Sequence, residues 1–108
     1  MLKSLEPLGI RQAVLTSQDG LVIESAGSSS PDPDLLAAEL ATLVGTSQTL
    51  TKTLGGSLRR FSLATENREV LAVVFGRYCL GAVVDKGADR KGVGNELSRL
   101  ALRLGKTL

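Results

Sequence analysis

The stretch 32–56, DPDLLAAELATLVGTSQTLTKTLGG, constrains the fold more than any other part of the chain. Its start and end signals predict one helix of about six turns. Asp32 can cap the helix, and Pro33 suits the first helical position, where no amide hydrogen is needed. Gly55 and Gly56 end it, because glycine adopts the left-handed conformation of a helix C-cap without penalty.

The apolar residues of this helix recur in steps of four and three, so they share one face. They are Leu36, Leu40, Leu43, Leu50 and Leu54, with Ser47 in the gap. We expect this leucine face to pack against the rest of the fold.

The opposite face of the same helix is a line of threonines, which also step by four and three: Thr42, Thr46, Thr49 and Thr53. From residue 35 to 54 only Glu39 and Lys52 carry charge, whereas a solvated helix face normally carries many charges. Two interpretations remain open at this point. The face is either a neutral surface in contact with water or a surface that meets another protein.

The remaining segments predict strands around this helix and a second helix at the end. Residues 10–16 and 21–26 form a hairpin around Gln18-Asp19-Gly20, since Asp-Gly between apolar runs is a strong hairpin signal. Residues 58–65 read as an edge strand, because adjacent long charged side chains discourage stray pairing. Residues 70–75 and 78–84 are nearly unbroken apolar strands, so we expect helices on both faces of the sheet.

The closing helix is amphipathic, with Val93, Leu97, Leu100 and Leu104 in steps of four, three and four. Residues 1–8 allow two helical turns at most. The order is therefore short helix, two strands, long helix, three strands and helix. It predicts a single α+β layer sandwich over residues 1–108.

Composition limits the classes of function. No apolar run is long enough to span a membrane, and the N-terminus lacks the features of a signal peptide, so we expect no membrane insertion and a cytoplasmic location. Residues 1–54 hold three basic and six acidic side chains, whereas residues 55–108 hold ten and five. Only three aromatic residues occur and no basic-aromatic motif, which argues against nucleic-acid binding.

The sequence is poor in catalytic groups. It has no histidine, which is the commonest general base, and one cysteine, Cys79, which lies in an apolar run typical of a buried residue. Gly105-Lys106-Thr107 matches the end of a phosphate-binding loop, but Leu100 stands where the first glycine belongs. We therefore predict a protein that is not an enzyme and that has no catalytic, metal or cofactor site.

The chain resembles a roadblock/dynein light chain domain, similar to the bacterial MglB-type regulators of Ras-like GTPases. The resemblance lies in three segments, VLTSQDGLVIESAG at 14–27, LLAAELATLVGTSQTLTKTLGG at 35–56 and VLAVVFGRYCLGAVVD at 70–85, and in the closing helix. It implies a roadblock, profilin-like α/β/α sandwich. Its five-stranded antiparallel sheet has the strand order 2-1-5-4-3, with the long helix on one face and the terminal helices on the other.

The resemblance also implies a dimer, either of identical or of different chains. Third strands would pair edge to edge, and long helices would meet across the two-fold axis. The residues expected at the dimer interface are Leu43, Ser47, Leu50, Leu58, Phe61 and Ser62.

The function implied by the resemblance is that of a regulator or scaffold for a small Ras-like GTPase. The residues expected to contact this partner are Glu39, Thr42, Thr46, Thr49 and Thr53 on the long helix, with Arg59 and Arg60 beside it. Two other classes remain open. One is a structural adaptor subunit of a larger complex, and the other is a module that senses a small ligand, because layered sheets can enclose a pocket.

Overall fold

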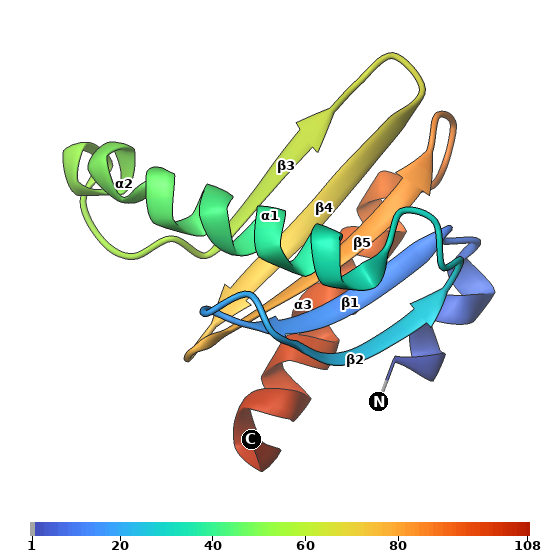
Figure 1. Ribbon diagram of the computed structural model, residues 1–108, viewed down its shortest axis with the longest axis horizontal. Coiled ribbons are helices and arrows are strands. Elements are labelled where there is room, and N and C mark those ends of the chain that lie inside the picture. Colours follow the sequence, from blue (N-terminus) through green and yellow to red (C-terminus); the bar gives the residue numbers. More distant parts are fainter. Residues whose placement is uncertain (1) are drawn as a thin grey trace.

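The computed structural model describes residues 2–108, with the exception of the side chain of Glu6. Figure 1 shows the strands of the sheet and the helices that cover them. In chain order the elements are η1 (Lys3–Leu8, a 3-10 helix), β1 (Gln12–Ser17), β2 (Val22–Gly27), α1 (Pro33–Thr46), α2 (Gln48–Leu54), β3 (Arg60–Ala64), β4 (Arg68–Phe75), β5 (Tyr78–Asp85) and α3 (Arg90–Thr107).

The strands form one antiparallel sheet in the order β2-β1-β5-β4-β3. This confirms the predicted fold class and strand order. The central strand β5 pairs with β1 along one side and with β4 along the other. Six consecutive residues of β5, from Cys79 to Val84, are buried, as expected for a strand covered on both faces.

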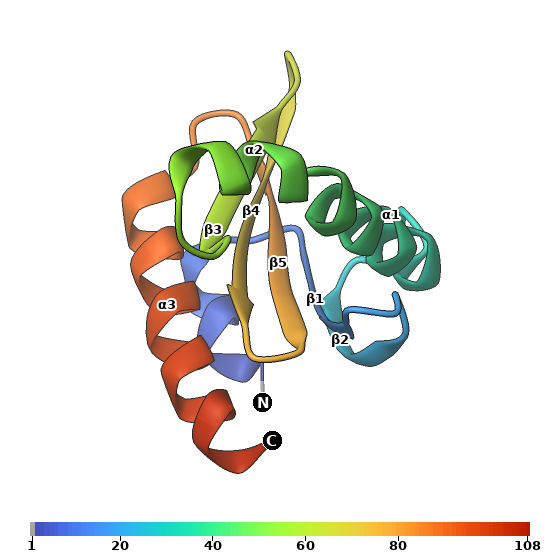
Figure 2. The same ribbon diagram turned by 90° about the vertical axis from the view of Figure 1, so that its left-hand side faces the viewer.

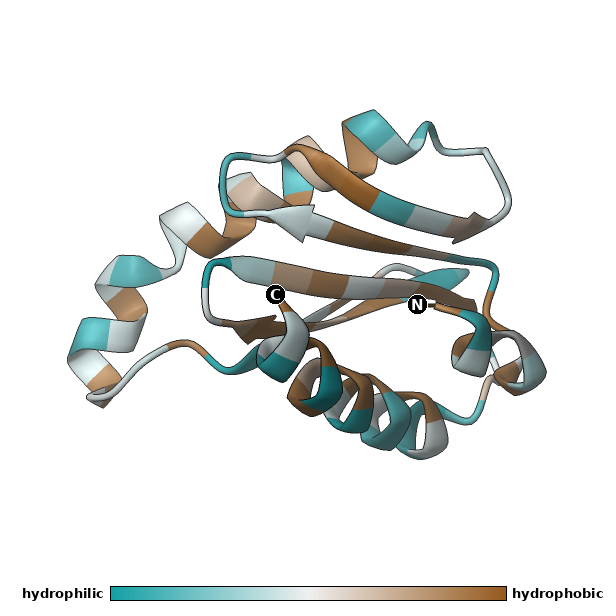
Figure 3. Ribbon diagram, turned by 90° about the horizontal axis from the view of Figure 1, so that it is seen from below, coloured by the Kyte–Doolittle hydropathy of each residue, from teal (hydrophilic) through white to brown (hydrophobic). Residues whose placement is uncertain are grey.

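Two hydrophobic cores lie on opposite faces of the sheet, because successive side chains of a strand point in opposite directions. Figure 2 shows α1 on one side of the sheet and α3 on the other, and Figure 3 shows hydrophobic strands between the helices. The core under α1 contains Val14, Leu36, Ala37, Leu40, Val44, Ala72, Cys79 and Val83. The core under η1 and α3 contains Leu2, Leu5, Ala13, Leu15, Leu80, Ala82, Val84, Val93, Leu97, Leu100 and Leu104.

The predicted Asp-Gly turn joins β1 to β2 and also makes room for α1. Gly20 has φ 85°, and its amide donates to the Ser17 carbonyl at 3.0 Å. A Cβ atom at Gly20 would lie 3.2 Å from the Cα of Ala38 on α1. Glycine is therefore favoured here both by the left-handed backbone and by the close approach of the helix.

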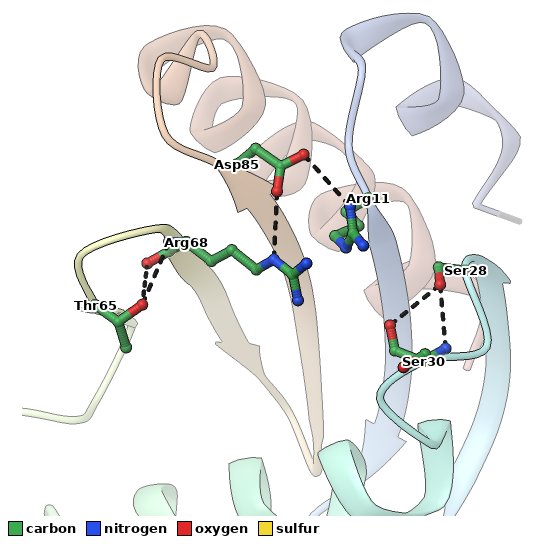
Figure 4. Close-up of polar contacts among 6 residues, drawn as sticks. All are labelled: Arg11, Ser28, Ser30, Thr65, Arg68 and Asp85. Carbon is green, nitrogen blue, oxygen red and sulfur yellow. Dashed lines mark hydrogen bonds and ion pairs between the residues drawn. The ribbon is translucent and has the colours of Figure 1, made fainter.

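Ion pairs join the ends of β4 and β5 to the residue just before β1 (Figure 4). Asp85, at the end of β5, lies 3.6 Å from Arg11 and 3.4 Å from Arg68, which begins β4. All three side chains are substantially exposed, so these pairs add little stability. Nearby, the Thr65 hydroxyl binds the backbone of Arg68 and closes the turn between β3 and β4.

The prediction of one continuous helix over 32–56 is wrong, because the structure has two helices separated at Ser47. The backbone of Ser47 is still near helical, with φ −77° and ψ −7°, so the break is a bend. Its hydroxyl donates to the Val44 carbonyl at 2.9 Å. Gly45 and Ser47 lie close together here, and nearby glycine and serine residues are a common cause of helix kinks.

The burial of the leucine face also differs between the two sides of this bend. Leu36 and Leu40 are buried under α1, but α2 buries no residue, and Leu50 and Leu54 are 61% and 76% exposed. Figure 1 shows the reason, since α1 crosses the sheet whereas α2 continues past the edge formed by β3. The predicted packing of the leucine face is thus correct for α1 and wrong for α2.

Candidate functional site

The outer face of α1 and α2 is exposed along its whole length. Each of the five helix residues predicted to contact a partner is exposed: Glu39, Thr42, Thr46, Thr49 and Thr53. Leu35 extends this line toward the start of α1 and is 54% exposed. Sequence reasoning missed Leu35, although it lies four residues before Glu39 and so continues the same spacing. We call these six residues the outer helix face.

Three of the four threonine hydroxyls on this face bond back to the helix that carries them. Thr42 donates to the Ala38 carbonyl at 2.9 Å, Thr46 to Leu43 at 3.2 Å, and Thr53 to Thr49 at 3.3 Å. The protons of these three hydroxyls are therefore used inside the helix. What the face offers outward is mainly methyl groups and acceptor oxygens, which suits packing against another protein better than it suits chemistry.

An apolar groove runs between α1 and β3, open to solvent and with a volume of about 570 Å³. It is lined by Leu36, Glu39, Leu40, Thr42, Leu43, Leu63 and Val70. Leu63 on β3 is 48% exposed and forms one wall. Sequence reasoning did not assign a role to Leu63. It lies two residues after Phe61 on β3, and residues two apart in a strand point to the same face. Both side chains therefore lie on the α1 side of the sheet.

The outer edge of β3 has unpaired backbone groups, because β3 is the last strand of the sheet. The Val74 amide donates to the Arg59 carbonyl, and the Thr65 amide donates to the Arg68 carbonyl, both at 2.8 Å. In an antiparallel ladder every second residue bonds to the neighbouring strand. The amides and carbonyls of the intervening residues, Arg60, Ser62 and Ala64, therefore point away from β4.

The residues predicted for a dimer interface lie around this edge, but they differ in exposure. Leu50 on α2 and Ser62 on β3 are exposed, whereas four others are half-buried: Leu43, Ser47, Leu58 and Phe61. Leu58 and Phe61 pack against the core under α1, so part of their surface already serves the single chain. The structure thus brings the six residues to one border of the molecule.

The two arginines predicted to lie beside the long helix are placed differently. The Arg60 guanidinium donates to the Ser98 hydroxyl of α3 at 3.0 Å, so this side chain lies on the face opposite α1. Arg59 lines the same α3-side hollow as Ser98. The structure therefore does not bring Arg60 together with the outer helix face, because Arg60 alternates with Phe61 along the strand.

The remaining features of the described residues concern chemistry and membranes. Within residues 2–108 no group of three or more His, Cys, Asp or Glu side chains could hold a metal ion. No helix in that range is both long and apolar enough to cross a bilayer.

Cys79 is buried, as predicted, and burial raises the pKa of its thiol to about 12. Gly105-Lys106-Thr107 lies at the end of α3 and not in a phosphate-binding loop that precedes a helix. The Thr107 hydroxyl donates to the Arg103 carbonyl.

Comparison with solved structures finds the same fold in several proteins. A structure described as MglB with a tetrameric arrangement superposes with a TM-score of 0.90 at 24% identity, covering 96% of this chain and 81% of that one. Myxococcus xanthus MglB gives a TM-score of 0.86 at 20% identity, covering 95% and 86%. Acanthamoeba castellanii profilin II gives 0.70 at 16% identity, covering 95% and 90%, in agreement with the predicted profilin-like architecture.

Comparison of the sequence is more specific, because it identifies a family rather than a fold. A search of curated proteins returned no match. The family model for the Roadblock/LC7 domain matches residues 5–85, which comprise most of the chain from η1 to the end of β5. The match covers the outer helix face, the α1–β3 groove and the free edge of β3. The chain therefore belongs to the Roadblock/LC7 domain family.

Proposed function

We propose that this protein is a noncatalytic, dimeric regulator or scaffold that binds a small Ras-like GTPase in the bacterial cytoplasm. One observation carries the proposal. An exposed helix face whose one charged residue is Glu39 and an apolar groove lie directly beside a strand whose outer edge is unpaired. Such a combination leaves both backbone bonds and apolar area for protein contacts.

The dimer would form where two copies of β3 pair antiparallel about Ser62. Since Arg60, Ser62 and Ala64 direct their backbone groups outward, this register pairs Ser62 with its copy and Arg60 with Ala64 of the second chain. Phe61 would then lie beside Leu63 of the second chain, on the α1 side of the joined sheet. This pairing would cover Leu63, which is half exposed in the single chain.

The position of α2 fits the same arrangement. Because α2 extends past the β3 edge, it would lie over the second chain, and its exposed Leu50 and Leu54 would gain a surface to pack on. A two-fold axis through an antiparallel strand pair runs perpendicular to the sheet. Both outer helix faces would therefore lie on the same side of the dimer, next to each other.

We assign GTPase binding to this paired helix surface. The support comes from the low charge of the outer helix face, from the internally bonded threonines, and from the fold similarity to MglB at a TM-score of 0.90. The resemblance to MglB-type regulators supplies the class of partner. Among the predicted contacts we keep Glu39, Thr42, Thr46, Thr49 and Thr53. We leave out Arg60, which faces α3, and Arg59, which lines the same hollow on the α3 side.

The test is binding to small Ras-like GTPases of the same organism, each loaded with GDP or with a nonhydrolysable GTP analogue. We expect one of them to be retained in its GTP-like state. A Thr46→Arg substitution places a long cation at the centre of the outer helix face and should reduce that retention. Ser29→Arg adds the same charge on the exposed loop between β2 and α1, and should leave retention unchanged.

Absence of binding in both nucleotide states would contradict the proposal. Equal binding in both states would instead favour the alternative of a structural adaptor. Equal loss of binding in the Thr46→Arg and Ser29→Arg variants would show that the outer helix face is not the contact surface.

A further inference from the structure

A second groove lies on the opposite face of the sheet, between α3 and the strands β3 and β4. Its larger part has a volume of about 600 Å³ and includes Leu71, Val73 and Leu97 in its lining. A smaller part of about 230 Å³ lies toward Phe75 and Leu102. Arg60 and Val73 line both parts, so the two parts adjoin each other at Arg60 along α3. We call them together the α3 groove.

The groove exists because α3 does not cover the whole sheet. This helix packs mainly on β4 and β5. On the same face, β3 carries Arg60, Ser62 and Ala64, which are exposed and fill little space above β4. As a result, β4 keeps a row of alternating apolar side chains that are only half-buried: Leu71, Val73 and Phe75. The groove therefore has an apolar floor without a covering element.

The rim of the groove is positively charged. The Arg60 side chain reaches across it to Ser98, a neutral partner, and Lys91 stands exposed at the start of α3. Arg90 is also on the rim, but Glu69 neutralises it through a 2.7 Å hydrogen bond. Among the described side chains, Arg59, Arg60 and Lys91 form no ion pair, and no Asp or Glu lines either part of the groove.

We propose that the α3 groove binds an acidic, extended peptide segment of a partner protein, with apolar side chains placed on the floor and carboxylates on the rim. Charge complementarity selects the acidic segment, since three cations without carboxylate partners surround apolar side chains. This site is separate from the outer helix face, which lies across the sheet, and does not depend on GTPase binding.

The dimensions fit a short extended segment. From Lys91 to Leu102 the helix runs about 16 Å at about 1.5 Å per residue, which accommodates about five extended residues at about 3.3 Å each. In an extended chain alternate side chains point the same way, so one set would reach the apolar floor and the other the rim. A bilayer is too flat to reach a floor recessed behind α3, which favours a peptide over an anionic membrane.

The experiment is selection of displayed random peptides of about twelve residues on the full-length protein, at about 0.1 M salt. Peptides that emerge are then made with a fluorescent label, and their binding is measured by anisotropy. We expect them to be acidic with interspersed apolar residues, and to bind more weakly as the salt concentration rises. Neutral or basic peptides, or no enrichment, would overturn the proposal.

Two matched variants locate the binding. The double substitution R60E/K91E reverses two rim charges and should weaken binding about tenfold or more. The control K106E/R77E makes the same charge change at two exposed residues that do not line the groove. It should change binding less than about twofold. Thermal melting of both variants checks that the fold is intact.

Equal weakening by the two double variants would overturn the proposal, because binding would then follow net charge alone. Vesicles rich in phosphatidylglycerol and a short DNA duplex serve as competing probes. If either binds the protein and R60E/K91E abolishes that binding while acidic peptides do not bind, the groove serves a membrane or a nucleic acid instead.

Discussion

Replacing Leu63 by serine tests the proposed dimer, because this side chain is only half used within a single chain. Burying a leucine side chain completely is worth about 2 kcal/mol. Leu63 is 48% exposed, so about 1 kcal/mol remains to be gained at the interface. The two-fold axis places two copies there, and the expected loss is about 2 kcal/mol, or about thirty-fold in the Kd of the dimer.

Sedimentation velocity over a range of protein concentrations measures that Kd. The matched control is Leu21→Ser, since Leu21 is 69% exposed but lies next to β2, at the other edge of the sheet. This control should leave the Kd of the dimer unchanged. Thermal melting at low concentration reports the cost to the single chain, where Leu63→Ser also removes the buried half of the side chain.

Three results would refute the reasoning. An unmodified protein that stays monomeric at high micromolar concentration has no such dimer. An unchanged Kd in Leu63→Ser would place the interface away from the α1–β3 groove. A larger effect of Leu21→Ser would assign the interface to the β2 edge.

Two further predictions concern the β3 edge and the buried thiol. Ser62→Pro removes an amide donor that points away from β4, so it should weaken the dimer by about ten-fold or more while the single chain stays folded. Leu63→Pro removes an amide that bonds to β4, so it should unfold the chain, which circular dichroism would show. Equal unfolding by both would contradict the assigned ladder. Burial raises the pKa of Cys79 to about 12, from 9.0, so the unfolded state releases the thiol proton first as the pH rises. Stability should therefore be lost above pH 9, by about 1.4 kcal/mol at pH 10, and a Cys79→Ala variant melted at pH 8 and pH 10 should lack this component.

The sequence alone was enough to predict the five strands and the closing helix, whereas the strand order was an expectation from the family resemblance. Apolar runs in 70–75 and 78–84 required cover on both faces, and the Asp-Gly turn fixed the first hairpin. The line of threonines was also predictable, since periodicity determines which residues share a helix face. These are local properties, and each can be inferred from a few neighbouring residues.

Only the tertiary structure decided which part of residues 32–56 packs against the sheet of the same chain. Leu40 and Leu54 have the same place in the leucine pattern, yet one is buried over the sheet and the other is 76% exposed beyond β3. Likewise, Arg60 and Phe61 are neighbours in sequence but serve opposite faces. Periodicity gives the direction of a side chain relative to its own element, whereas burial depends on how far the neighbouring sheet extends. That extent is set by strand pairings between distant segments, so it is visible only in the folded chain.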